Sequence, residues 1–202
     1  MRSLSQINLL SKGLNELADE KRGIHSYLLG KFEKYSRCYL DIRLPHYEIL
    51  RAKSFLDDVM ELTDHSIMIT IEDLVGTLYD QFLNQVRHAA KISTLGTKVL
   101  KKKEELEGNS NKIVTSFEQI NPNHWALVEK KVPAKVKRKI IRIEMHRKYI
   151  ERGEIFLYDM TKIMPEFQLT LEELISLLLL DFVHEVEKGN SKKIMDQIIK
   201  ST

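Results

Sequence analysis

The sequence of 202 residues has one cysteine, one tryptophan and no long hydrophobic run. With Cys38 as its single cysteine, the chain cannot form an internal disulfide, which excludes the small secreted proteins that depend on such bonds. The most apolar run, 174–180, is interrupted by Ser176 and is far shorter than the roughly 20 residues that span a bilayer. Residues 1–17 also lack the continuous apolar stretch of a signal peptide. We therefore expect a cytoplasmic protein that makes no membrane contact.

The motifs of the common enzyme classes are missing as well. Gly96 precedes a threonine and a lysine, but the rest of a phosphate-binding loop is absent, and there is no Gly-x-Ser-x-Gly motif. Cys38 falls in an expected strand, where a buried and unreactive thiol is the usual state. Asp181 and His184 lie one helical turn apart, but the second histidine of a zinc-binding helix is lacking. The sequence predicts no cofactor and no metal, and it leaves a catalytic activity open but unsupported.

What the sequence does contain is the composition of a folded protein. Apolar residues make up 43%, charged residues 30%, and the formal net charge is +3. A chain of this length buries well over half of the surface of its extended form, so a core without disulfides is expected.

The first part of the chain is predicted to be helical and then extended. Apolar residues at steps of three and four predict a helical pair over 4–19 and 24–35. Residues 38–44 then alternate between apolar and polar, which is typical of a strand with one buried face, and Pro45 ends this run.

The next segments are less uniform in their pattern. Residues 46–62 fit a helix that begins at Pro45, although 55–60 also fit a strand. A clear helix is predicted over 69–86, because Thr70 and an acid three residues later resemble a capping box.

Residues 91–123 are rich in Lys, Glu, Asn, Ser and Gly and mark the best candidate boundary. Within this charged connector, 97–107 is expected to continue as an exposed helix. We therefore divide the chain into a helical pair with a first strand-helix unit (1–90), the connector (91–123), and a second strand-helix unit with a tail helix (124–202).

In the second unit, alternation predicts a hairpin of strands 141–145 and 155–158 around a turn at 151–154. The competing helix, from Pro133 to Gly153, would carry charges all round its surface.

The strongest helix is predicted over 170–188, with a capping box at Thr170 and Glu173 and with Gly189 at its C-terminal end. A short amphipathic tail helix is expected over 191–200.

The two capped helices resemble each other at an offset of one hundred residues. The identical pairs are Thr70/Thr170, Glu72/Glu172, Leu74/Leu174, Leu78/Leu178, Phe82/Phe182 and Val86/Val186. Upstream, 42–44 resembles 141–143. This echo predicts an α+β fold with a helical N-terminal pair followed by two related strand-helix units; an all-α fold is the alternative. Amphipathic helices can also share capping boxes and leucine spacing without a duplication.

The helix over 169–186 carries more apolar residues than one stripe can hold. Exposed leucines would be costly, because each gains about 1.5–3 kcal/mol on full burial. We therefore expect a partner or a second copy of the chain to cover part of this surface, as a homo-oligomer. The candidate association residues are Leu174, Leu177, Leu178, Phe182, Leu78 and Phe82.

Basic residues are concentrated in 130–152, where lysines and arginines outnumber acids by eight. A basic ribbon of this kind can lie along phosphates. The candidate phosphate contacts are Lys137, Arg138, Lys139, Arg142, Arg147 and Lys148. The segment lacks an aromatic pair for base stacking and a zinc module, so a solvated basic surface is the simpler interpretation.

Together these patterns favour a cytosolic adaptor or regulatory protein that acts through protein contacts. The alternative is a regulator associated with nucleic acid, which would use the basic segment 130–152.

Overall fold

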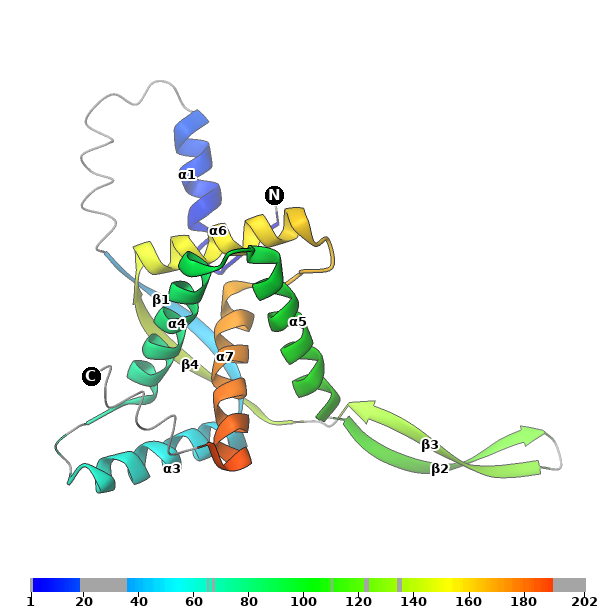
Figure 1. Ribbon diagram of the computed structural model, residues 1–202. Helices are drawn as coiled ribbons and strands as arrows, with labels where there is room; N and C mark the ends of the chain where they lie inside the picture. The colour runs from blue at the N-terminus through cyan, green and yellow to red at the C-terminus, as the bar shows by residue number, and fades with distance from the viewer. Residues whose placement is uncertain are drawn as a thin grey trace.

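The computed structural model describes residues 2–18, 36–64, 66, 68–109, 111–121, 124–133 and 136–190. It has a mixed α+β fold in which helices pack on one face of a small antiparallel sheet (Figure 1). In chain order the elements are α1 (Leu9–Ala18), β1 (Arg37–Pro45), α3 (His46–Leu62), α4 (Ile71–His88), α5 (Ile92–Asn109), β2 (Asn111–Asn121), β3 (His124–Pro133), β4 (Arg138–His146), α6 (Arg147–Ile163), α7 (Leu171–Glu185) and the π-helical turn η1 (Val186–Asn190).

Most of the expected elements are present. Strand β1, helix α4 and helix α7 form where alternation and capping predicted them, and both capping boxes are complete. The ambiguous segment 46–62 is entirely helical, as α3. The first predicted helix begins at Leu9 rather than at residue 4. The predicted helices over 24–35 and 191–200 lie outside the described residues.

The predicted hairpin of 141–145 and 155–158 is wrong, because residues 147–163 form the helix α6. The glycine taken for a turn, Gly153, lies inside this helix and faces α4 and α7. A Cβ there would lie 2.0 Å from Tyr79 Oη and 2.6 Å from Leu171 Cδ1, so the close approach of the elements requires a glycine. Glu154, which was predicted to lie in the same turn, is also in this helix and is completely buried.

Strand β4 pairs instead with β1, far away in the sequence. The two strands run antiparallel in a continuous register from Arg37↔His146 to Pro45↔Arg138. Their inner face is buried against the helices: Leu40, Ile42, Leu44, Ile143 and Met145. Figure 1 shows both strands passing behind α4 and α7. We call this two-stranded sheet the ribbon.

Each strand of the ribbon is followed by two helices, so that β1–α3–α4 and β4–α6–α7 are corresponding units. Helices α3 and α6 begin directly after their strands, at His46 and Arg147, an offset of 101 residues. The backbone angles at the two capping threonines nearly coincide, with φ/ψ of −93/168° at Thr70 and −91/167° at Thr170. The units therefore share their local geometry as well as their order.

Contacts between the units also occur in matching pairs. His46 N donates to Lys137 O at 2.9 Å, and Arg147 N donates to Ser36 O at the same distance. Across the core, Phe55 meets Phe182 edge-on with ring centroids 5.1 Å apart, and Phe156 meets Phe82 edge-on, also at 5.1 Å. Each contact becomes its counterpart when the units are exchanged, which defines an approximate two-fold axis.

The offset between the units differs from the one matched in the sequence. In the strand and first helix it is 101 residues, so Ile42 corresponds to Ile143 rather than to Ile141. It falls to 100 at the second helix, because the connection from Leu62 to Thr70 is one residue longer than that from Ile163 to Thr170. The match of 42–44 with 141–143 is therefore out of register.

The most apolar helix, α7, packs against α3, α4, α5 and α6 as well as β1, and it lies among them in Figure 1. Helices α7 and α4, the two helices with capping boxes, are therefore in direct contact. Among the described residues, no helix is both long enough and apolar enough to cross a bilayer.

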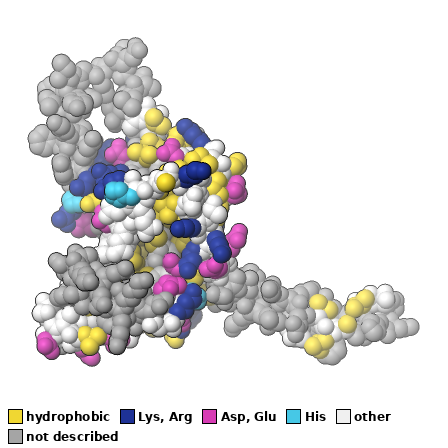
Figure 2. Space-filling model, viewed as in Figure 1, with side chains coloured by type: hydrophobic (Ala, Val, Ile, Leu, Met, Phe, Trp, Pro, Cys, Tyr) yellow, Lys and Arg dark blue, Asp and Glu magenta, His cyan; other side chains and the backbone are white. Residues whose placement is uncertain are grey.

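Residues 111–121 and 124–133 pair as the antiparallel strands of the β2–β3 hairpin, and the expected connector boundary at 123 falls between them. The hairpin extends away from the rest of the molecule (Figure 1). Hydrophobic side chains are visible towards its far end in Figure 2, and Ile120 and Leu127 are 57% and 59% exposed. The charged segment thus begins with the helix α5, which includes the helix expected over 97–107, and continues into this projecting hairpin.

The N-terminal residues are anchored by two buried acids. The carboxylate of Glu154 accepts hydrogen bonds from the Ser5 hydroxyl and from Leu9 N at the start of α1. That of Glu172 accepts one from Gln6 N at 2.7 Å. The Gln6 amide in turn bonds both backbone groups of Asp41, which covers the outer edge of β1.

We expect Glu154→Ala to lower the free energy of unfolding by about 2–4 kcal/mol, because it leaves buried donors without their charged acceptor. Chemical denaturation measures this change. Glu166→Ala, at an exposed acid close to the end of α6, is the control and should change stability by no more than about 0.5 kcal/mol. Equal losses in the two variants would contradict the anchoring role of Glu154.

Candidate nucleic-acid interface

The outer face of the ribbon is exposed and carries charged side chains on both strands. Side chains alternate between the faces of a strand, so the outward residues of β1 are Arg37, Tyr39, Asp41 and Arg43. Those of β4 are Arg138, Ile140, Arg142 and Glu144. Tyr39 is 59% exposed and Ile140 is 53% exposed, although Leu40, Ile42 and Ile143 on the inner face are almost fully buried.

Asp41 and Arg142 face each other across the centre of the ribbon. Arg142 Nε and Nη2 donate to the two carboxylate oxygens of Asp41 at 2.8 and 3.2 Å. This hydrogen bonding, with the attraction between the charges, lowers the pKa of Asp41 and raises that of Arg142. The pair is held in a planar two-bond geometry, which fixes the direction of the guanidinium on the surface.

At one end of the ribbon, Arg37 Nη1 lies 3.2 Å from Glu144 Oε2. Arg147 and Lys148 follow at the start of α6 and are half-buried. The Lys148 ammonium lies 4.9 Å from the centre of the Tyr149 ring. This end therefore combines three basic groups with one acid.

The opposite end is more basic. Arg43, Lys137, Arg138 and Lys139 are all exposed, and the pairing of Leu44 with Lys139 and of Pro45 with Arg138 brings both strands together there. None of these four cations has an ion-pair partner within the described parts of the chain. We call them the basic end.

The six predicted phosphate contacts are thus distributed along β4 and the first turn of α6. Lys137, Arg138 and Lys139 meet at the basic end, Arg142 lies at the centre, and Arg147 and Lys148 lie at the other end. Of these six residues, Arg138 and Arg142 point outward from β4; sequence reasoning missed Arg37, Tyr39 and Arg43, which β1 contributes to that outer face. The alternation that identified this strand already marked them as outward, but their neighbours on β4 could not be inferred from it.

The predicted association residues lie mostly in the core. Leu174, Leu177, Phe182 and Phe82 are 0–8% exposed and are covered by this same chain. Leu78 and Leu178 are partly buried and line a cavity of about 480 Å³ between α4, α5 and α7. Most of the apolar surface of α7 is therefore covered by this same chain, and the expected homo-oligomer stays a prediction.

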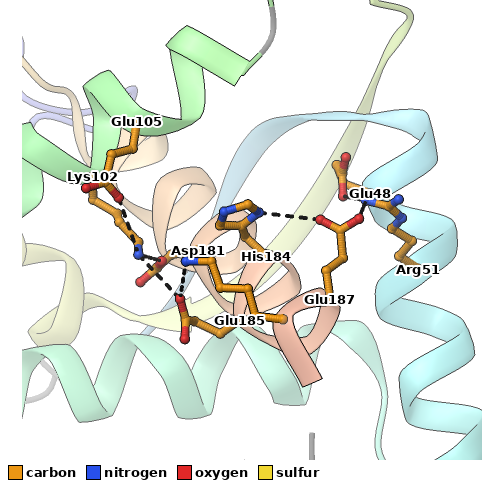
Figure 3. Close-up of polar contacts among 9 residues, drawn as sticks. Glu48, Arg51, Lys102, Glu105, Asp181, His184, Glu185 and Glu187 are labelled. Atoms are coloured by element: carbon orange, nitrogen blue, oxygen red, sulfur yellow. Dashed lines mark hydrogen bonds and ion pairs between the residues drawn. The ribbon is translucent and has the colours of Figure 1, made fainter. Parts of the chain in front are cut away.

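Asp181 and His184 point to different partners (Figure 3). Lys102 Nζ lies 2.7 Å from Asp181 Oδ1 and 3.6 Å from Glu185 Oε1, so it neutralises acids of α7 from α5. His184 Nδ1 lies 3.4 Å from Glu187 Oε2, and Glu187 also pairs with Arg51 of α3. Within the described residues, no group of three or more His, Cys, Asp or Glu could hold a metal ion. These contacts join helices to one another.

Comparison of the chain with protein-family models, curated proteins and solved structures finds no match. The proposed function therefore rests on the geometry of the ribbon.

The Asp41–Arg142 pair gives a prediction for the pH dependence of the site. Because its pKa is lowered, Asp41 should remain ionised in the folded protein as the pH falls through the ordinary range of aspartate. Its contribution to stability is complete above that range and should be lost as the pH falls from there through the lowered pKa. In Arg142→Ala, the Asp41 pKa should return to the ordinary range. NMR titration of the side-chain carboxyl measures both values, and identical titration curves would contradict the pairing.

Proposed function

We propose that the protein binds double-stranded DNA by placing the outer face of the ribbon in the major groove. The single observation that carries this proposal is an exposed two-stranded antiparallel ribbon, backed by helices on its other face and lined with arginines.

The size of the ribbon supports this placement. The major groove of B-DNA is about 12 Å wide and admits a two-stranded ribbon, whose strands lie about 4.8 Å apart. The buried side chains of the inner face, including Leu40, Ile42 and Ile143, keep both strands fixed against the helices. An inserted ribbon therefore loses little conformational freedom on binding.

The distribution of charge supports the same placement. Basic groups lie at both ends of the ribbon, where the two phosphate backbones flank an inserted element. Cations at such positions contribute affinity by releasing counterions, whatever the sequence of the DNA. At the centre, the Arg142 side chain is 68% exposed even though it is paired with Asp41, so it faces the floor of the groove.

We further propose a regulatory role in the cytoplasm, which agrees with the single cysteine and the absence of a catalytic motif. The adaptor hypothesis, with protein contacts through α7, is the less supported one, because the side chains assigned to it are used in the core. A protein that docks on Tyr39 and Ile140 is the competing use of the ribbon.

The test is fluorescence anisotropy of a labelled mixed-sequence duplex, measured over a range of salt concentrations. The full chain should bind at low salt, and its affinity should fall linearly with salt on logarithmic axes. Lys137→Glu with Arg138→Glu should weaken binding at least tenfold and reduce the salt slope by about two.

The matched control is Lys98→Glu with Lys101→Glu, which changes the net charge equally but on exposed positions of α5. It should retain an affinity within about threefold of the unmodified chain, since long-range charge effects are screened beyond a Debye length of about 10 Å. Absence of binding at low salt would contradict the proposal. Equal losses of affinity in both variants would show that the duplex is attracted by the net charge of the protein and that the ribbon is not the interface.

A further inference from the structure

We infer that the DNA site recognised by the ribbon is asymmetric and is bound in one orientation. This inference rests on the proposed function and adds the class of target sequence. Two-fold symmetric proteins read palindromic sites, because equivalent side chains meet equivalent bases in the two halves. The backbone of the ribbon has approximate two-fold symmetry, but the side chains at equivalent positions differ.

The approximate two-fold axis passes through the centre of the ribbon. At the offset of 101 residues that relates the strands, position 41 corresponds to position 142, and these two residues are also partners in the strand register. A residue paired with its own equivalent lies on the axis. Two identical strands would place the same residue there twice, whereas this chain places Asp41 against Arg142, with Nε and Oδ1 2.8 Å apart.

The next outward positions differ just as strongly. Arg43 corresponds to Glu144, so the charge is reversed, and Tyr39 corresponds to Ile140, so a hydroxyl-bearing ring is replaced by an aliphatic chain. Among the outward positions, Arg37 and Arg138 are equivalent and alike. They occupy the ends, where contacts go to phosphates and carry little sequence information.

These differences give the two halves different base preferences. Arg43 pairs with Ile140 in the register, and together they offer a two-bond donor for guanine and an apolar surface for the thymine methyl group. Tyr39 pairs with Glu144, whose carboxylate accepts from the amino group of cytosine. A site that satisfies both halves has different bases on the two sides of its centre.

The experiment is selection of duplexes by the full chain from a pool with a randomised window of about 15 base pairs, enough for one and a half helical turns. The enriched motif should have no two-fold symmetry. Within it, one base pair at the Arg43 side should prefer guanine about tenfold over its alternatives, and Arg43→Ala should remove that preference while other positions keep theirs.

A symmetrising variant sharpens the test. Tyr39→Ile with Glu144→Arg makes both equivalent pairs of positions identical, and both changes lie on exposed positions of the outer face. The motif selected by this variant should become palindromic on either side of its centre. Tyr39→Phe with Glu144→Asp changes the same positions but retains their difference, so its motif should stay asymmetric. Thermal melting of both variants confirms that the fold is retained.

The outcomes separate this inference from the proposed function. An asymmetric motif that the symmetrising variant converts to a palindrome supports the inference. A palindromic motif for the unmodified chain, enrichment without any preferred sequence, or an unchanged motif in the symmetrising variant overturns it while leaving DNA binding in place. If no duplex is retained at low salt, DNA binding itself fails, and the inference fails with it.

Discussion

The antiparallel pairing of β1 with β4 is the constraint on which the rest of the structure depends. These strands are separated by three helices and a hairpin in the sequence, yet they form one continuous ladder. A two-stranded sheet alone is marginal in water, so its inner side must be covered. Both helix pairs supply that cover, and their aromatic contacts, Phe55 with Phe182 and Phe82 with Phe156, close the core between the units. One pairing thus orders the core on one side and presents a charged surface on the other.

Local signals in the sequence were sufficient where the structure is itself local. The side chains of Thr70 and Thr170 cap their helices with acids three residues later, and such boxes can be recognised without knowledge of the fold. The prediction for the segment that forms helix α6 was wrong for the opposite reason. Gly153 is unfavourable inside an isolated helix, and Glu154 places a carboxyl group on the buried face. Both make sense only through Tyr79 and the N-terminal segment, which lie far away in the chain. Residues whose roles depend on distant partners cannot be assigned from spacing alone.

The candidate site likewise combines residues that local sequence signals identified with residues that depend on distant partners. The basic residues of β4 and α6 were identified from their concentration in one segment, whereas Arg43 joined them only through the register with β1. Conversely, the leucines of α7 suggested an interface because the sequence does not show how many neighbours surround a helix. Once α3, α4, α5, α6 and β1 are in place around it, Leu174 and Leu177 are core residues. Burial depends on the tertiary arrangement, and hydrophobicity alone cannot distinguish a core from a contact surface.

The presence of both ribbon strands in one polypeptide has a consequence for dosage. When a ribbon is built from separate chains, dilution dissociates it, so active protein varies more steeply than total protein. Here strand association is an intramolecular closure whose free energy does not depend on the number of molecules in the cell. Under the proposed DNA-binding function, occupancy of the DNA by a chain that acts alone should then follow a simple hyperbola in protein abundance, giving a graded response even at very low copy number.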